Sequence, residues 1–171
     1  MKCYLKSFIA AAAVSVLAAC TAVLPQPAAV PVLGEGEVHW FQAERFHPAE
    51  ENSTNAVLAV YREGEALRFV LTDALGAPLS RQLLDRNGWR NDGFVMPNAD
   101  ARRLFAALLP VLAADGKAVY PSAGQENHQG GAVFAWKQQE LWRIETEQGG
   151  YRIAFPDGVR WHLHILDEGA E

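Results

Sequence analysis

The chain has little cysteine, no excess of positive charge and no apolar run long enough to span a membrane. Its 171 residues include two cysteines, Cys3 and Cys20, both near the start. The formal net charge of −5 argues against a nucleic-acid partner, since such proteins carry basic patches. The first apolar stretch, residues 8–16, is shorter than the roughly 20 residues of a spanning helix. We therefore expect no disulfide framework, no nucleic-acid binding and no retained transmembrane anchor.

The N-terminus does contain the pattern of a bacterial export signal. Lys2 and Lys6 form a positive start, an apolar core follows, and small residues precede a cysteine. The segment ends in Leu17, Ala18, Ala19 and Cys20, which resembles the lipobox of bacterial lipoproteins. An ordinary secretory signal is the alternative. We expect residues 1–19 to be removed and Cys20 to carry an N-acyl group, such as palmitate, and an S-diacylglycerol.

Lipid on Cys20 would decide where the protein is held. Loss of Lys2 and Lys6 would take the formal net charge from −5 to about −7, so basic residues are not expected to bind the membrane surface. Two or three acyl chains suffice, at about 0.8 kcal/mol per buried CH₂. Thr21 stands where an aspartate commonly retains lipoproteins at the inner membrane. We expect the export and sorting machinery to deliver the protein to the periplasmic face of the outer membrane.

The rest of the chain divides into a short tether and one domain. Residues 20–34 include three prolines and no charge, a composition that favours an extended, polyproline-like tether. A leader without a specific role is the alternative. Residues 35–171 are long enough to bury a core and are expected to form a single periplasmic, β-rich domain.

Alternating apolar residues and turn signals predict strands on both sides of one helix. The predicted strands cover residues 55–62, 65–73, 79–86, 89–96, 132–138, 140–146, 150–155 and 159–166. The helix begins after Asn98 as N-cap, and Pro110 should end or kink it. Residues 120–131 are expected to be a flexible polar connection. This order predicts a mainly antiparallel α+β fold.

No residue pattern indicates catalysis, so we expect a protein that is not an enzyme and has no cofactor besides the lipid. Neither Ser80 nor Ser122 lies in a nucleophile motif. His162 and His164 lie on one face of a predicted strand, and a third residue such as His128 would be needed for a metal site. The polar face of an amphipathic strand explains the two histidines more simply. We therefore treat them as weak metal candidates only.

Five tryptophans lie in or beside predicted strands, which is many for this length. Trp89, Trp142 and Trp161 are candidates for lining an apolar cavity that binds an acyl chain. The alternative is that bulky aromatic side chains fill a small core.

Residues 66–89, the helix that follows and the later strands resemble a family of small bacterial outer-membrane lipoproteins of uncharacterised function, distantly similar to LolA and LolB. Some members are encoded beside aryl-polyene biosynthesis genes. The resemblance covers about residues 55–166 and includes the L-G-x-P-L turn that starts at Leu75. It implies a strongly curved sheet, a half-open barrel, with the helix as its lid. It also implies that Leu75 corresponds to the exposed loop residue with which LolB contacts membranes.

These observations predict a non-enzymatic outer-membrane lipoprotein that shelters or transfers an acyl chain, a lipid or a lipoprotein. A structural or scaffold lipoprotein that binds envelope proteins is the alternative. A continuous apolar cavity would favour the first interpretation, and a solid core would favour the second.

Overall fold

The computed structural model describes residues 24–113 and 119–166. The predicted signal, the lipobox at Leu17, Ala18 and Ala19, and the lipidated Cys20 lie outside the described residues. Within them, no helix is long and apolar enough to cross a membrane.

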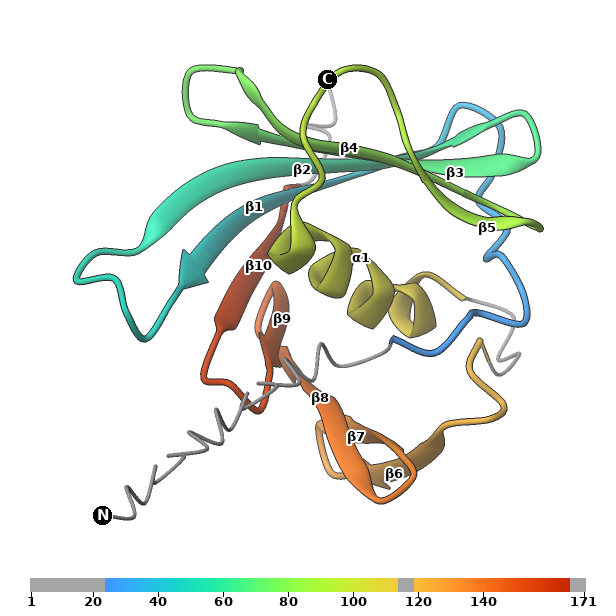
Figure 1. The fold of residues 1–171 in the computed structure, drawn as a ribbon, viewed down its shortest axis with the longest axis vertical. Coiled ribbons are helices and arrows are strands. Elements are labelled where there is room, and N and C mark those ends of the chain that lie inside the picture. Colours follow the sequence, from blue (N-terminus) through green and yellow to red (C-terminus); the bar gives the residue numbers. More distant parts are fainter. Residues whose placement is uncertain (1–23, 114–118, 167–171) are drawn as a thin grey trace, which may run out of the picture.

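Ten strands form one antiparallel sheet, and one helix lies against it (Figure 1). The first five strands are β1 (Val38–Phe46), β2 (Thr54–Glu63), β3 (Ala66–Asp73), β4 (Pro78–Asp85) and β5 (Gly88–Asn91). After α1 (Ala99–Leu112) come β6 (Gly124–His128), β7 (Gly131–Trp136), β8 (Gln139–Glu147), β9 (Gly150–Ala154) and β10 (Arg160–Leu166). The sheet order is β5-β4-β3-β2-β1-β10-β9-β8-β7-β6. The fold is therefore mainly antiparallel α+β, as predicted, and the sheet is not closed.

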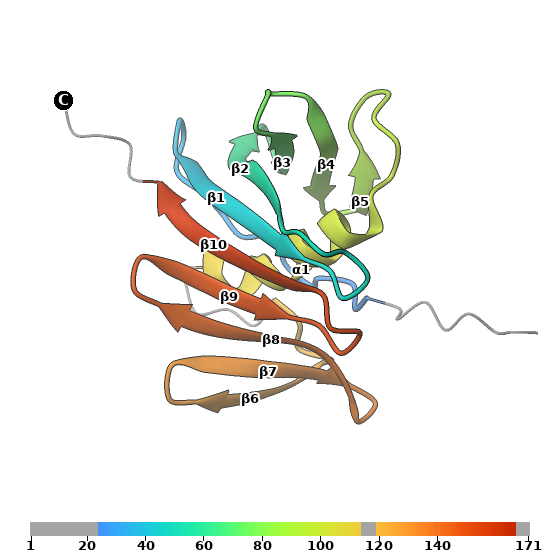
Figure 2. The same cartoon turned by 90° about the vertical axis from the view of Figure 1, so that its left-hand side faces the viewer.

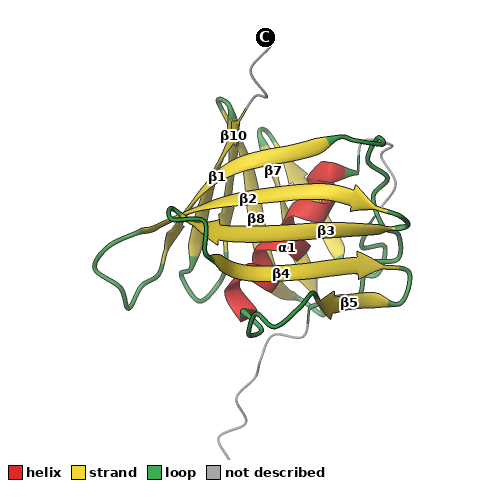
Figure 3. Ribbon diagram, turned by 90° about the horizontal axis from the view of Figure 1, so that it is seen from above, coloured by secondary structure: helices red, strands yellow, loops and turns green. Residues whose placement is uncertain are grey.

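The chain makes two meanders of neighbouring strands that join where β1 pairs with β10. Figure 2 shows the arm formed by β1–β5 above the arm formed by β10–β6. The sheet curves strongly, and α1 lies in the hollow between the two arms (Figures 1 and 3). Side chains on the concave face of the sheet therefore meet α1 from both arms.

Helix α1 begins where the sequence predicts and continues past the expected break. The side chain of Asn98 accepts a hydrogen bond from the Ala101 N–H at 3.0 Å, which is N-cap geometry. Pro110 lies within the helix and supplies no N–H for the carbonyl of Ala106, four residues earlier. The hydroxyl of Tyr120 donates to that carbonyl at 2.8 Å instead. The carbonyl released by proline is thus satisfied, and the helix runs on to Leu112.

Two strands have no counterpart among the predicted ones. β1 carries large apolar residues on both faces, with Phe41 buried and Trp40 38% exposed, so it shows no clear alternation of apolar and polar residues. β6 occupies part of the predicted polar connection, and all five of its residues are exposed. Because β6 buries almost no surface, its stability comes from its pairing with β7. The predicted strand 89–96 is also shorter, because β5 ends at Asn91.

Residues 24–34 of the proline-rich segment lie on the domain. The prediction that these positions form an extended tether apart from the domain is therefore wrong. Figure 1 shows this segment passing below α1 and then beside the sheet. Leu33 is buried, and the N–H of Ala28 donates to the carbonyl of Val119 at 2.8 Å. Leu24 and Val30 also pack against the core. An extended segment rich in proline, alanine and valine has apolar surface to bury, and it buries part of that surface against the core.

Candidate functional site

The turn between β3 and β4 holds Leu75 away from the domain. Its side chain is 94% exposed. One side-chain oxygen of Asp73 accepts hydrogen bonds from the N–H of Leu75 at 2.9 Å and of Ala77 at 2.8 Å. Gly76 adopts a φ of +84°, a conformation that glycine takes without strain. The turn is therefore well defined, and it presents the leucine that the resemblance singles out.

A second apolar loop lies beside this turn. Between β5 and α1, Phe94 is fully exposed and Met96 is 80% exposed. The loop follows the beginning of β4, since the N–H of Asp92 donates to the carbonyl of Arg81 at 2.9 Å. Figures 1 and 2 show both loops at the same end of the molecule. We refer to Leu75, Phe94 and Met96 as the apolar loop pair.

The sequence did not single out Phe94 and Met96. They lie within a stretch predicted as a strand, where apolar residues are expected to be buried. Their signal is the short spacing between Asn87-Gly88 and the N-cap at Asn98, which leaves little length for both a strand and a loop.

The three tryptophans proposed to contact a ligand pack in the core. Trp142 is fully buried, and its ring stacks on that of Phe134 with 5.1 Å between centroids. Trp161 is 3% exposed. Trp89 is half-buried, and its ring lies 5.2 Å from that of Phe69. In this conformation, α1 fills the hollow that an apolar ligand would need, with Phe105 fully buried against the Phe69 ring.

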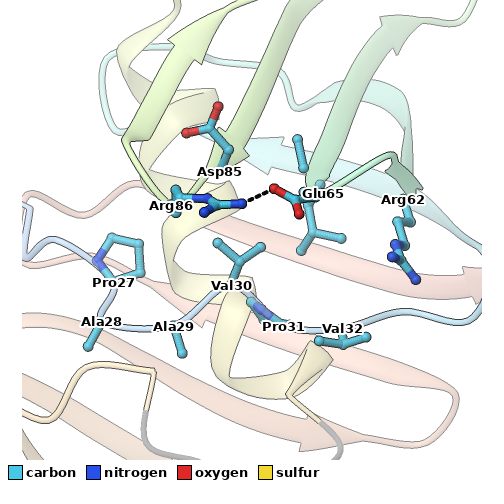
Figure 4. Close-up of a pocket in the computed structure, with 12 residues that line it drawn as sticks. Pro27, Ala28, Ala29, Val30, Pro31, Val32, Arg62, Glu65, Asp85 and Arg86 are labelled. Atoms are coloured by element: carbon cyan, nitrogen blue, oxygen red, sulfur yellow. Dashed lines mark hydrogen bonds and ion pairs between the residues drawn. The ribbon is translucent and has the colours of Figure 1, made fainter.

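Three depressions on the described surface have volumes of about 430, 520 and 400 Å³, and no tryptophan lines any of them. The first lies between residues 27–32 and the turns that follow β2 and β4 (Figure 4). Its charged side chains are Arg62, Glu65, Asp85 and Arg86, and Glu65 pairs with Arg86. Because its charges are balanced, this depression shows no preference for a ligand of one sign.

The weak metal candidates lie apart. His162 is half-buried, with its ring 4.9 Å from that of Phe46, and His164 is exposed. His128 lies on β6, separated from β10 by three intervening strands, or about 19 Å at the usual strand spacing. Among residues 24–113 and 119–166, no three His, Cys, Asp or Glu side chains gather into a possible metal site.

A polar cluster that no sequence pattern had indicated lies under the first turn of α1. Ser80 and Gln82 are each only 1% exposed, on the concave face of β4. The amide of Gln82 donates to the Ser80 hydroxyl at 3.0 Å and accepts a hydrogen bond from Arg102 Nε. The Arg102 guanidinium also lies 4.9 Å from the centroid of the Trp89 ring. Two polar residues at i and i+2, facing the core of an otherwise apolar strand, are the signal that could have identified this cluster.

No known family model matches the chain, and no curated protein matches it closely enough to count as a relative.

Proposed function

We propose that this protein is a LolB-like lipoprotein, anchored through Cys20 at the periplasmic face of the outer membrane, that transfers an acyl chain, a lipid or a lipoprotein. The apolar loop pair carries this proposal. Single exposed leucines are ordinary on protein surfaces, but Leu75, Phe94 and Met96 are three large, almost fully exposed side chains on neighbouring loops. Such a group gains free energy only by contact with another apolar surface.

The interior supports a sheltering role through its unpaired donors. The indole N–H groups of Trp142 and Trp161 are buried and have no hydrogen-bond acceptor among the described residues. Each buried, unpaired donor costs about 1–3 kcal/mol. Displacement of α1 by a ligand that carries oxygen atoms would satisfy these donors. Sheltering therefore requires α1 to move, as a lid would.

The scaffold alternative has its own supporting observation, which is the filled hollow. Leu104, Phe105 and Leu108 are fully buried between the two arms of the sheet, as in an ordinary packed core. A protein that keeps this conformation has no apolar cavity for an acyl chain. It would instead bind envelope proteins through its surface.

The test is transfer of a fluorescent acyl lipid between vesicles of phosphatidylethanolamine and phosphatidylglycerol, with the full-length lipidated protein in the donor vesicles. We expect the protein to accelerate transfer and the double variant Leu75→Glu/Phe94→Glu to lose most of that acceleration. Val32→Glu is the matched control, because Val32 is 76% exposed and lies on the N-terminal segment, outside the loop pair. Mass spectrometry of the purified protein should also detect a co-purified lipid.

Two outcomes would contradict the transfer proposal. Wild-type protein that leaves the transfer rate unchanged and carries no lipid would favour the scaffold. Equal loss of transfer in Val32→Glu would mean that the loop pair has no special role. Anchoring is tested separately: Cys20→Ser should abolish incorporation of a lipid label, and label that still enters this variant would refute the assignment.

A further inference from the structure

Arg102 differs from the other half-buried arginines of the described chain because it has no carboxylate partner. The others form ion pairs with Asp or Glu; they are Arg45, Arg68, Arg81, Arg103 and Arg152. Arg102 makes no such pair with a described residue. A guanidinium held partly out of water normally has a counter-charge, because desolvating an uncompensated charge is costly.

The surroundings hold Arg102 in one orientation. Its Nε donates to the Gln82 side chain, and the Ser80 hydroxyl in turn accepts from Gln82. Trp89 supplies a flat aromatic surface 4.9 Å from the guanidinium carbon. Arg102 and Phe105 are three residues apart on α1, so both face the side of the hollow formed by β3, β4 and β5. The guanidinium is thus positioned before any ligand arrives.

The terminal nitrogens of Arg102 are not fully buried. They make no hydrogen bond to a described residue, and they are not among the buried atoms that lack a partner. Burial of the side chain lowers the pKa of Arg102, because partial desolvation disfavours its charged form. An anion at these nitrogens would accept two parallel hydrogen bonds and supply the missing negative charge.

We propose that Arg102 binds the anionic head group, a carboxylate or a phosphate, of an acyl amphiphile whose chain lies along the loop that carries Phe94 and Met96. This inference rests on the proposed function and narrows its ligand to anionic amphiphiles. The location supports it, since the loop that carries Phe94 and Met96 leads directly into the helix turn that carries Arg102. Charge recognition and apolar surface then adjoin, as an amphiphile requires.

Calorimetric titration with three probes tests the proposal: laurate, its uncharged glycerol ester monolaurin, and acetate. The chain that starts at Thr21 serves for this purpose, because the buried core residues lie between Leu33 and Leu163. We expect laurate to bind wild type more tightly than monolaurin does, and acetate not to bind measurably. Arg102→Gln should weaken laurate binding by about tenfold or more and leave monolaurin binding within about twofold, as expected for loss of one charge-assisted pair.

Two further variants keep the result interpretable. Arg102→Lys retains the charge and should keep part of the preference for laurate. Arg103→Gln removes the neighbouring arginine, which pairs with Asp157, and should keep the full preference. A thermal melt of each variant confirms that it is folded.

The proposal is overturned if wild type does not bind laurate, if acetate binds as tightly, or if Arg102→Gln affects laurate and monolaurin equally. Its failure is distinguishable from failure of the transfer proposal. If laurate binding depends on Arg102 but vesicle transfer is unchanged in the variants of the apolar loop pair, only the transfer proposal is refuted. Transfer that depends on the loop pair, without laurate binding, would refute the Arg102 site alone.

Discussion

The two sides of α1 pack against similar aromatic groups, but their polar atoms differ in whether they have a partner. On the β5 side, the rings of Phe69, Trp89 and Phe105 lie 5.0 to 6.4 Å apart. Arg102 lies over the Trp89 ring and pairs with no described carboxylate. On the β8 side, Tyr120, Phe134 and Trp142 lie 5.1 to 6.5 Å apart.

On the β8 side, the polar atom of Tyr120 forms a hydrogen bond with α1. The hydroxyl of Tyr120 is used up by the carbonyl that Pro110 releases, and burial raises the pKa of Tyr120 well above its ordinary value. Arg102, by contrast, has nitrogens that bind no described residue. In this conformation the β8 side therefore stabilises α1 through Tyr120, whereas the β5 side, which adjoins the loop that carries Phe94 and Met96, has guanidinium nitrogens free of described partners.

The largest expected effect is on the β8 side. Trp142→Ala should lower the free energy of unfolding by about 3–5 kcal/mol, because it empties a fully buried site. Trp89→Ala should cost clearly less, since Trp89 is only half-buried. Urea denaturation measures both. A larger loss for Trp89→Ala would break the comparison, because the β5 side would then be the structural one.

Tyr120→Phe should lower the free energy of unfolding by about 1–3 kcal/mol, because the buried Ala106 carbonyl loses the hydroxyl that donates to it. Pro110→Ala provides a second test. Alanine at position 110 has a backbone N–H that can donate to the Ala106 carbonyl, as proline cannot. In the Pro110→Ala background, Tyr120→Phe should therefore cost less. An equal cost in both backgrounds would show that the hydroxyl does not replace the missing helix bond.

An ion pair between α1 and the turn before β10 should make a smaller, pH-dependent contribution. The hydrogen bonds from Arg103 lower the pKa of Asp157 below its ordinary value of 3.8. A lowered folded-state pKa means that the stabilisation is complete above the unfolded pKa and is lost as the pH falls through the folded one. Asp157 is about half exposed, so we expect less than about 1 kcal/mol.

Thermal melts of wild type and Asp157→Asn should differ slightly at neutral pH and converge below the ordinary Asp pKa. A difference that grows as the pH falls would have the wrong sign. Because this pair crosses neither aromatic group, the result should be independent of both tryptophan variants.

The smallest expected effect on stability is at the apolar loop pair. Leu75→Glu should change the free energy of unfolding by less than about 0.5 kcal/mol, because the side chain is 94% exposed. Thermal denaturation checks this directly. A loss comparable to that of Tyr120→Phe would mean that Leu75 is part of the packed structure and that its effect on transfer cannot be assigned to membrane contact.

Local patterns predicted much of this architecture. The β2–β3 turn and the helix start at Asn98 are readable because their signals lie within a few residues. β1, whose two faces both carry apolar residues, and β6, whose residues are all exposed, have no such local pattern. β1 is held by β2 and by β10, which lies at the other end of the chain, and no local pattern reports that second pairing. β6 is held by its hairpin with β7, and its exposed polar residues show no alternation that would predict a strand.

The candidate site was also predictable only in part. Leu75 was found from a turn that resembles a known one, whereas Phe94 and Met96 were assigned to a strand. Arg102 is not distinguishable by sequence from any other charged residue at the start of a helix, since its partner Gln82 lies on β4, 20 residues earlier in the chain.

The sequence by itself determined the order of strands, helix and strands, the helix start and the lipobox pattern, because each depends on residues close together in the chain. Only the tertiary structure decided that α1 fills the hollow, that Tyr120 allows it to continue past Pro110, and that residues 24–34 lie on the domain. It also decided that Arg102 pairs with no carboxylate of the described residues. The physical reason is that burial and charge compensation depend on which surfaces meet, and those surfaces come from segments far apart in the chain.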